Sequence, residues 1–293
     1  MQTEATITSV RSVQRKDPDV LDHFKGSAAL YRKWSPEGHL HFGYWKWPMS
    51  PFDRRAMLEE LVYQVMEPME LRAGGTYADF GCGYGTAAIT IARRYNVHVD
   101  AYTVVPEQAR EGMERAEREK IDDLVTMHHA DMRCTGLPDG GMDGVIGMES
   151  WCYGTGTAKR DVIREAYRVL RPGGMISLVD GFLVKRPDRL RKPIVDMVQR
   201  GWALECFPQR DDFIEALKAE GFRDIKIVDL GSRIGTCALH GPPLMLITMI
   251  EHVTRKHRLD RFEWAHLKSC MLGILLGTQL DLFRYLGVTA TKG

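Results

Sequence analysis

The sequence has little of several features that would assign it to particular classes of protein. Its Lys and Arg residues almost balance its Asp and Glu residues, and the formal net charge of +1 gives no indication of binding to nucleic acid or to an acidic membrane surface. The longest apolar stretch, residues 270–276, is far too short to span a bilayer. Residues 1–17 lack the apolar centre of a signal peptide. We therefore expect a cytoplasmic protein without a membrane span.

Metal-binding and disulfide patterns are also absent from the sequence. The six cysteines are scattered and form no C-x-x-C pair, so free thiols in a reducing compartment are expected. His39 and His41 lie two residues apart, and His128 and His129 are adjacent, without a Cys or a carboxylate at metal-ligand spacing. We predict no metal site.

The length and composition are those of a globular protein. A chain of 293 residues with 44% hydrophobic and 27% charged residues allows one large domain, or one domain with a cap. We expect an N-terminal arm and helical lid over residues 1–72, in which residues 1–17 are a loose arm or an oligomer contact. Within the lid, a short helix is predicted over residues 21–31, and a longer one runs to Leu71 with Asp53 as its N-cap. The main domain is expected over residues 73–293, and the protein is expected to form a homo-oligomer.

Strand and helix patterns alternate through the main domain. Buried strands are predicted near residues 76–80, 97–103, 124–130, 144–149, 175–184 and 225–230, with helices between most of them. This alternation is typical of an α/β fold with a mostly parallel sheet and helices on both faces. A helical insertion over about residues 240–280, before a last strand over 283–290, is expected to form part of a substrate cap.

A glycine-rich turn follows the first predicted strand. Residues 79–85 read Asp-Phe-Gly-Cys-Gly-Tyr-Gly, and an apolar helix pattern begins directly after them. Glycine permits positive φ angles and lets a ligand approach the backbone, and Asp79 could meet a cationic group of that ligand. The alternative interpretation is an ordinary strand-to-helix turn whose glycines serve packing.

The turn resembles motif I of the class I methyltransferases, which use S-adenosylmethionine (SAM). The resemblance implies a Rossmann-like fold with a seven-stranded sheet, and it implies that Asp79, Gly81 and Gly83 hold the amino-acid end of SAM. Residues 167–174, Tyr-Arg-Val-Leu-Arg-Pro-Gly-Gly, resemble a later segment common to the same superfamily.

Two further segments resemble the cofactor site of one subgroup. Residues 99–108 are similar to the second strand of cyclopropane fatty acid synthases, sterol methyltransferases and geranyl diphosphate C-methyltransferases. This implies that Thr103 stands where many enzymes have an acidic residue, and that Gln108 binds the SAM ribose. Asp131 and Met132 resemble the adenine-binding turn.

An aromatic stretch precedes the main domain. Residues 31–47, here called the lid segment, are dense in aromatic and histidine residues. Part of the segment resembles the N-terminal lid of small-molecule methyltransferases, which implies that Tyr44 contacts SAM. Tyr31, Trp34 and Trp45 are predicted to contact the substrate, and His41 is a possible base. The alternative is a surface loop held to the core by its aromatic residues.

Residues 148–153, Met-Glu-Ser-Trp-Cys-Tyr, carry the expected chemistry. Geranyl diphosphate C-methyltransferases resemble this segment better than relatives with His in place of Tyr153. A carbocation formed when an alkene takes up a methyl group would be stabilised by aromatic faces and deprotonated by a carboxylate. Glu149 and Tyr153 are therefore the predicted catalytic residues, although Glu149 could instead have a structural role under SAM or the lid. Trp151, Trp202 and Phe207 are further predicted substrate contacts.

The predicted function is SAM-dependent C-methylation of an alkene in an isoprenoid or prenylated metabolite, with S-adenosylhomocysteine (SAH) as the cofactor product. Two alternatives remain at this point. One is O- or N-methylation of a small natural product, and the other is a SAM-binding protein that catalyses a cyclisation without methyl transfer.

Overall fold

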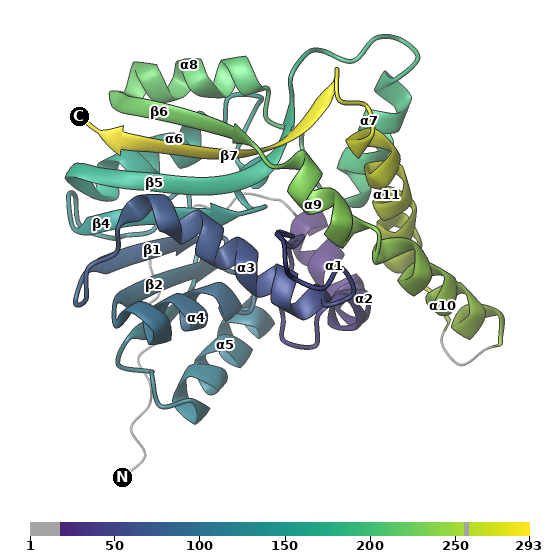
Figure 1. Ribbon diagram of the computed structural model, residues 1–293, viewed down its shortest axis with the longest axis horizontal. Coiled ribbons are helices and arrows are strands. Elements are labelled where there is room, and N and C mark those ends of the chain that lie inside the picture. Colours follow the sequence, from purple (N-terminus) through teal and green to yellow (C-terminus); the bar gives the residue numbers. More distant parts are fainter. Residues whose placement is uncertain (1–17, 255–257) are drawn as a thin grey trace.

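The computed structural model describes residues 18–254 and 258–293 (Figure 1). The arm predicted for residues 1–17 lies outside these described residues. A seven-stranded sheet with the order β3-β2-β1-β4-β5-β7-β6 forms the centre of the protein, which confirms the predicted fold class. Its strands are β1 (Thr76–Phe80), β2 (His98–Thr103), β3 (Val125–His129), β4 (Met142–Met148), β5 (Leu170–Leu183), β6 (Phe222–Asp229) and β7 (Phe283–Lys292).

The first five strands are parallel, and their register aligns the carboxyl ends of β1 to β4, while β5 continues to Leu183. Phe80 of β1 pairs with Tyr102 of β2, and Met148 of β4 pairs with Val179 of β5. The segments that follow β1, β2, β3 and β4 therefore emerge at one edge of the sheet. Strand β7 inserts between β5 and β6 and is antiparallel to both.

Helices cover both faces of the sheet (Figure 1). One hydrophobic core packs α3 (Arg54–Met66), α4 (Thr86–Tyr95) and α5 (Pro106–Arg118) against one face. A second core packs α6 (Arg160–Val169) and α8 (Arg210–Glu220) against the other. Because strand side chains alternate between faces, Tyr77 belongs to the first core and its neighbour Ala78 to the second.

The remaining helices gather beyond the carboxyl edge of the parallel strands and are here called the cap (Figure 1). They are α1 (Pro18–Gly26), α2 (Ala28–Trp34), α7 (Lys192–Gly201), α9 (Gly231–Ala238), α10 (Gly241–Val253) and α11 (Arg261–Gly277). Two short 3-10 turns follow α3 and β4, at Glu67–Met69 and Trp151–Tyr153. Helices α9 to α11 occupy the segment between β6 and β7. The sequence patterns did not indicate α7, which packs along α11.

One predicted helix is corrected by the structure. Residues 21–31 were expected to form a single helix, but the chain breaks at Ser27 between α1 and α2. Gly26 lies so close to Phe262 that a Cβ there would stand 2.6 Å from the phenylalanine Cβ. Contact with α11 thus sets the break, and a distant contact of this kind leaves no local pattern. No helix among the described residues is long and apolar enough to cross a membrane.

Candidate active site

A cavity of about 920 Å³ lies at the carboxyl edge of the sheet, beneath the cap. The segments after β1, β2, β3 and β4 line one part of it, and α1, α2, α10, α11 and the segment after α7 line the other. Open parallel sheets bind ligands at this edge because strand ends and helix N-termini converge there. We call this space the central cavity.

Asp79 lies beneath the glycine turn and is a fully buried carboxylate. Its side chain is 1% exposed, and among the described residues neither of its oxygens has a hydrogen-bond partner. Burial raises the pKa of Asp79 to about 7. Gly81 and Gly83 line the cavity directly above, with φ angles of +83° and +55°. The Asp79 carboxylate is buried, has no partner in the described part of the chain and lies beneath the glycine backbone that lines the cavity. This arrangement fits the cationic amino group of SAM.

The next two strand ends supply the other predicted cofactor residues. The Thr103 hydroxyl donates a hydrogen bond of 2.7 Å to Gln108 Oε1 and accepts one from the Val105 N–H, which fixes the Gln108 amide at the cavity wall. Asp131 and Met132 also line the cavity, and Arg133 forms an ion pair with Asp131. The structure therefore brings together the residues predicted for the two ends of SAM.

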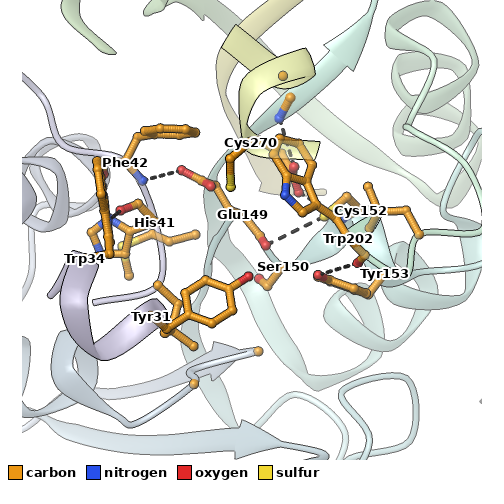
Figure 2. A pocket seen from close by; sticks show the side chains of 18 of the residues that line it. Tyr31, Trp34, His41, Phe42, Glu149, Ser150, Cys152, Tyr153, Trp202 and Cys270 are labelled. Atoms are coloured by element: carbon orange, nitrogen blue, oxygen red, sulfur yellow. Dashed lines mark hydrogen bonds between the residues drawn. The ribbon is translucent and has the colours of Figure 1, made fainter. Parts of the chain in front are cut away.

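Glu149 lies at the end of β4, in a backbone conformation with φ of +51°. Its Oε1 accepts a hydrogen bond of 2.6 Å from the Phe42 N–H and another of 2.6 Å from the Tyr285 hydroxyl. Burial raises the pKa of Glu149 to about 7, against the opposing effect of these two donors. Figure 2 shows the carboxyl group between Phe42 on one side and the Trp202 and Tyr153 side of the cavity on the other. This carboxyl group is positioned to exchange a proton close to neutral pH.

Aromatic side chains form much of the remaining wall (Figure 2). The Tyr153 hydroxyl donates a hydrogen bond of 3.0 Å to the Trp202 carbonyl, which connects the turn after β4 to the end of α7. Phe24 stacks on Tyr31 and contacts Tyr153. Tyr31, Trp34, Tyr153, Trp202 and Phe207 all line the cavity as the sequence analysis expected.

His41 also lines the cavity, but both of its ring nitrogens are engaged. Nδ1 lies 2.6 Å from the Phe42 carbonyl, which can only accept, so Nδ1 carries the proton. Nε2 lies 3.1 Å from His39 Nδ1 and must then accept from it. Burial lowers the pKa of His41 to about 4. A base needs an available lone pair, and this arrangement occupies both nitrogens.

Besides Asp79, which lies beneath the glycine turn, three predicted site residues lie away from the cavity lining. Trp151 is 1% exposed and packs in the second core beside Phe80 and Phe213. Trp45 packs against the N-terminal part of α3 and donates its indole N–H to the Met49 carbonyl. Tyr44 packs against the first core. An aromatic residue in a loop or a strand-end turn can anchor the chain as readily as it can face a ligand, and the sequence pattern does not distinguish the two.

The sequence analysis missed several lining residues. Asp180 is 3% exposed, and burial raises its pKa to about 6 although the Cys152 and Gly181 N–H groups donate to it. It lies three residues before the end of β5, so strand-end reasoning did not find it. Tyr285 and His266 come from β7 and α11, more than 100 residues after Glu149, and no local signal marked them.

The cationic side chains that line the cavity have acidic partners. Lys33 pairs with Glu251, Arg133 with Asp131, and Arg284 with Asp229. Most of the other side chains that line the cavity are apolar or aromatic. The part of the cavity beneath the cap therefore suits an apolar molecule.

Solved structures with this architecture include enzymes of several activities. The cyclopropane synthase MmaA2 from Mycobacterium tuberculosis superposes with a TM-score of 0.81 at 13% identity, over 96% of this chain and 99% of that one. The cyclase SpnF gives a TM-score of 0.73 at 21% identity, over 93% and 95% of the chains. Geranyl diphosphate C-methyltransferase from Streptomyces coelicolor A3(2) gives 0.69 at 19% identity, over 94% and 98%. The fold is that of the class I methyltransferases.

Sequence comparison identifies a methyltransferase domain in the chain. Residues 78–174 match a family described as a methyltransferase domain. The 27-O-demethylrifamycin SV methyltransferase of Amycolatopsis mediterranei is 32% identical over 187 residues, 62% of this chain and 66% of that protein. Methyltransferase GfsG of Streptomyces halstedii is 30% identical over 163 residues, 55% of this chain and 57% of that protein. These alignments thus span less than two thirds of either relative. Residues 78–174 therefore form a methyltransferase domain, as the sequence predicts, and the related proteins support SAM as its cofactor.

Proposed function

We propose that this protein transfers the methyl group of SAM to a carbon atom of an alkene in an isoprenoid or prenylated metabolite. The observation that carries the proposal is the buried Glu149 carboxyl group in a cavity lined by aromatic side chains. When bound, SAM supplies an activated methyl group, so the protein's own residues mainly have to position the acceptor and exclude water.

The fate of the positive charge explains the residue types. Addition of a methyl group to an alkene leaves a carbocation, which either loses a proton or is attacked by another part of the molecule. The faces of Tyr31, Tyr153 and Trp202 provide the negative potential that favours a cation in an apolar space. Glu149 stabilises the charge and accepts the proton. Because the pKa of Glu149 is raised to about 7, its carboxyl group can hold that proton near neutral pH.

The pairing of the lining cations favours a substrate without a diphosphate group. Lys33, Arg133 and Arg284 each already neutralise a carboxylate. A diphosphate is bound by Arg and Lys donors or through a metal ion, and recruiting these three would break existing ion pairs. We therefore favour an uncharged prenyl compound.

O-methylation is the second candidate, since one relative is named as a 27-O-demethylrifamycin SV methyltransferase. In that case Glu149 would remove the proton of a hydroxyl group on a natural product. The same product analysis tests both candidates.

The test is incubation with SAM and a panel of uncharged prenyl compounds, together with hydroxylated polyketides. Mass spectrometry would detect a gain of one CH2 unit, and NMR would locate it on carbon or oxygen. A new methyl group on a former alkene carbon supports the proposal, whether proton loss has restored or moved the double bond or cyclisation has consumed it. A methyl group on oxygen with the alkene intact contradicts it and favours the second candidate. Conversion without any release of SAH would instead indicate a cyclase that does not methylate.

A further inference from the structure

A polar group of side chains interrupts the apolar wall that α1, α2 and α11 contribute to the central cavity. It consists of His23, Tyr31, His266 and Cys270, here called the His266 cluster. The ring centroid of His266 lies 4.7 Å from that of Tyr31 and 5.4 Å from that of His23. Tyr31, His266 and Cys270 line the cavity, among neighbours such as Leu267 and Ile274.

The hydrogen bonds of this cluster are incomplete within the described residues. His266 is 7% exposed, and its Nε2 lies 3.4 Å from Cys270 Sγ, but its Nδ1 has no partner there. The Tyr31 hydroxyl makes only a long contact of 3.4 Å to His23 Nε2. Buried polar atoms are nearly always satisfied, so two under-satisfied groups side by side in a cavity wall need an explanation.

The charge of the cluster limits what it can bind. Burial lowers the pKa of His23 to about 4 and that of His266 to about 3, so both rings are neutral at physiological pH. Neutral imidazole and phenol groups can donate and accept hydrogen bonds but give no ionic attraction. An uncharged hydroxyl or carbonyl group matches this wall better than a carboxylate, a phosphate or an amine.

We propose that the His266 cluster is the subsite that recognises a neutral oxygen-bearing group, a hydroxyl or a carbonyl, on an otherwise apolar substrate. The inference rests on the proposed function and narrows its substrate class from prenyl hydrocarbons to oxygenated prenyl compounds. His266 and Tyr31 bind and position the substrate through this group and take no part in the proton transfer assigned to Glu149.

The test compares two probes of similar shape on the SAH-loaded protein. Farnesol carries a hydroxyl group, and farnesene is the corresponding hydrocarbon. Dissociation constants are measured by tryptophan fluorescence for wild type, His266→Leu and His266→Asn. The Asn amide can place a polar atom near the position of Nδ1, whereas Leu cannot. Thr248→Val is the matched control, because Thr248 also lines the cavity but its hydroxyl already donates 2.9 Å to the Leu244 carbonyl.

We expect wild type to bind farnesol at least about 10-fold more tightly than farnesene, since a buried polar group left without its partner disfavours the hydrocarbon. His266→Leu should remove this preference, because it relieves the penalty on farnesene and removes the partner of the farnesol hydroxyl, while SAH affinity stays near wild type. His266→Asn should restore part of it, and Thr248→Val should keep all of it.

Two results would overturn the inference, and they are distinguishable. An equal preference for farnesol in wild type and His266→Leu would overturn the subsite alone. Failure of both probes to bind would overturn the subsite together with the isoprenoid class of the proposed function. Should His266→Leu not fold, Tyr31→Phe provides the same comparison, because it removes one hydroxyl group and leaves the ring in place.

Discussion

The main-chain N–H of Phe42 donates a hydrogen bond of 2.6 Å to the carboxyl group of Glu149, although 107 residues separate them in the chain. Phe42 belongs to the lid segment and Glu149 to the end of β4. The same carboxyl oxygen also accepts from Tyr285 on β7. One carboxyl group thus connects the lid, the parallel part of the sheet and its antiparallel edge. The two roles considered for Glu149, structural and catalytic, are therefore compatible in one residue.

Glu149→Gln should separate these two roles. The amide keeps a carbonyl oxygen that can accept from Phe42 and Tyr285, but it lacks the charge and basicity of the carboxylate. We expect SAM affinity within a few-fold of wild type and turnover lower by roughly 10²-fold or more, the usual scale for a lost acid–base group. Calorimetric titration with SAH and single-turnover kinetics provide the two measurements. A loss of SAM affinity in proportion to activity would assign Glu149 to the cofactor site instead.

Turnover should depend on pH through the same group. Burial raises the pKa of Glu149 to about 7, and only the deprotonated form can accept a proton. At saturating SAM, kcat should therefore rise as the pH increases through about 7 and level off above it. The profile of Glu149→Gln should be flat over this range, and a wild-type profile that is already flat from pH 5.5 to 8.5 would exclude Glu149 as the base.

Asp79→Asn should weaken cofactor binding and stabilise the protein without SAM. The raised pKa of about 7 means that the charged Asp79 carboxylate is less favourable in the folded protein than in the unfolded chain. Ionisation of Asp79 therefore lowers the free energy of unfolding above pH 7 and has no such effect at low pH, where the group is protonated in both states. The neutral amide removes that cost, and we expect a higher Tm at pH 8 in the absence of SAM but not at pH 4. Binding of the SAM ammonium group requires the carboxylate, so SAH affinity should fall by at least about 10-fold.

The pH dependence of SAH binding gives an independent check on Asp79. Wild-type affinity should decrease as the pH falls below about 7, because protonation of Asp79 removes the partner of the ammonium group. Titrations in buffers of different ionisation enthalpy should reveal proton release on binding near pH 6.5. The Asn variant should show neither effect, and a wild-type affinity independent of pH would speak against an Asp79–ammonium contact.

Gly83→Val should impair SAM binding through the glycine turn. The φ of +55° disfavours a β-branched residue, and a Cβ at this position would stand 2.7 Å from Leu40 Cδ1 in the lid segment. We expect a folded protein with SAH affinity reduced by about 10-fold or more, because the added side chain displaces Leu40 and blocks the approach of a ligand to the turn backbone. Gly156→Val is the control, because Gly156 has a similar φ of +64° but nothing within 4 Å of its Cβ position. Equal affinities for both variants would refute the role of the turn.

Tyr153→Phe tests whether the ring or the hydroxyl group of Tyr153 matters. The hydroxyl donates to the Trp202 carbonyl, so it already has a structural partner, and the ring lines the cavity. We expect turnover to fall by less than about 10-fold, since the aromatic face that would stabilise a cation is retained. Tyr153→Leu removes the face and should reduce turnover more. A large loss in the Phe variant would instead assign a proton-transfer or anchoring role to the hydroxyl.

Local sequence determined the fold class and which residues predicted to bind the cofactor meet at one edge of the sheet. The glycine turn, the apolar strands and the polar residues at their ends follow each other at short range, and parallel pairing necessarily brings those ends to one edge of the sheet. Asp79, Gly81, Gly83, Thr103, Gln108, Asp131 and Glu149 therefore came together as predicted. Even the N-cap of α3 was readable, and Asp53 accepts a hydrogen bond of 3.0 Å from the Ala56 N–H.

The tertiary structure alone decided which aromatic and polar residues face the substrate part of the cavity. Trp151 and Trp202 were both predicted to contact the substrate, yet Trp151 fills the core and Trp202 lines the cavity. His266 and Tyr285 reach the site from α11 and β7, more than 100 residues after Glu149 in the chain. The direction of a side chain on a loop or cap helix depends on which distant surface that element packs against. The residue type alone does not indicate which surface that is.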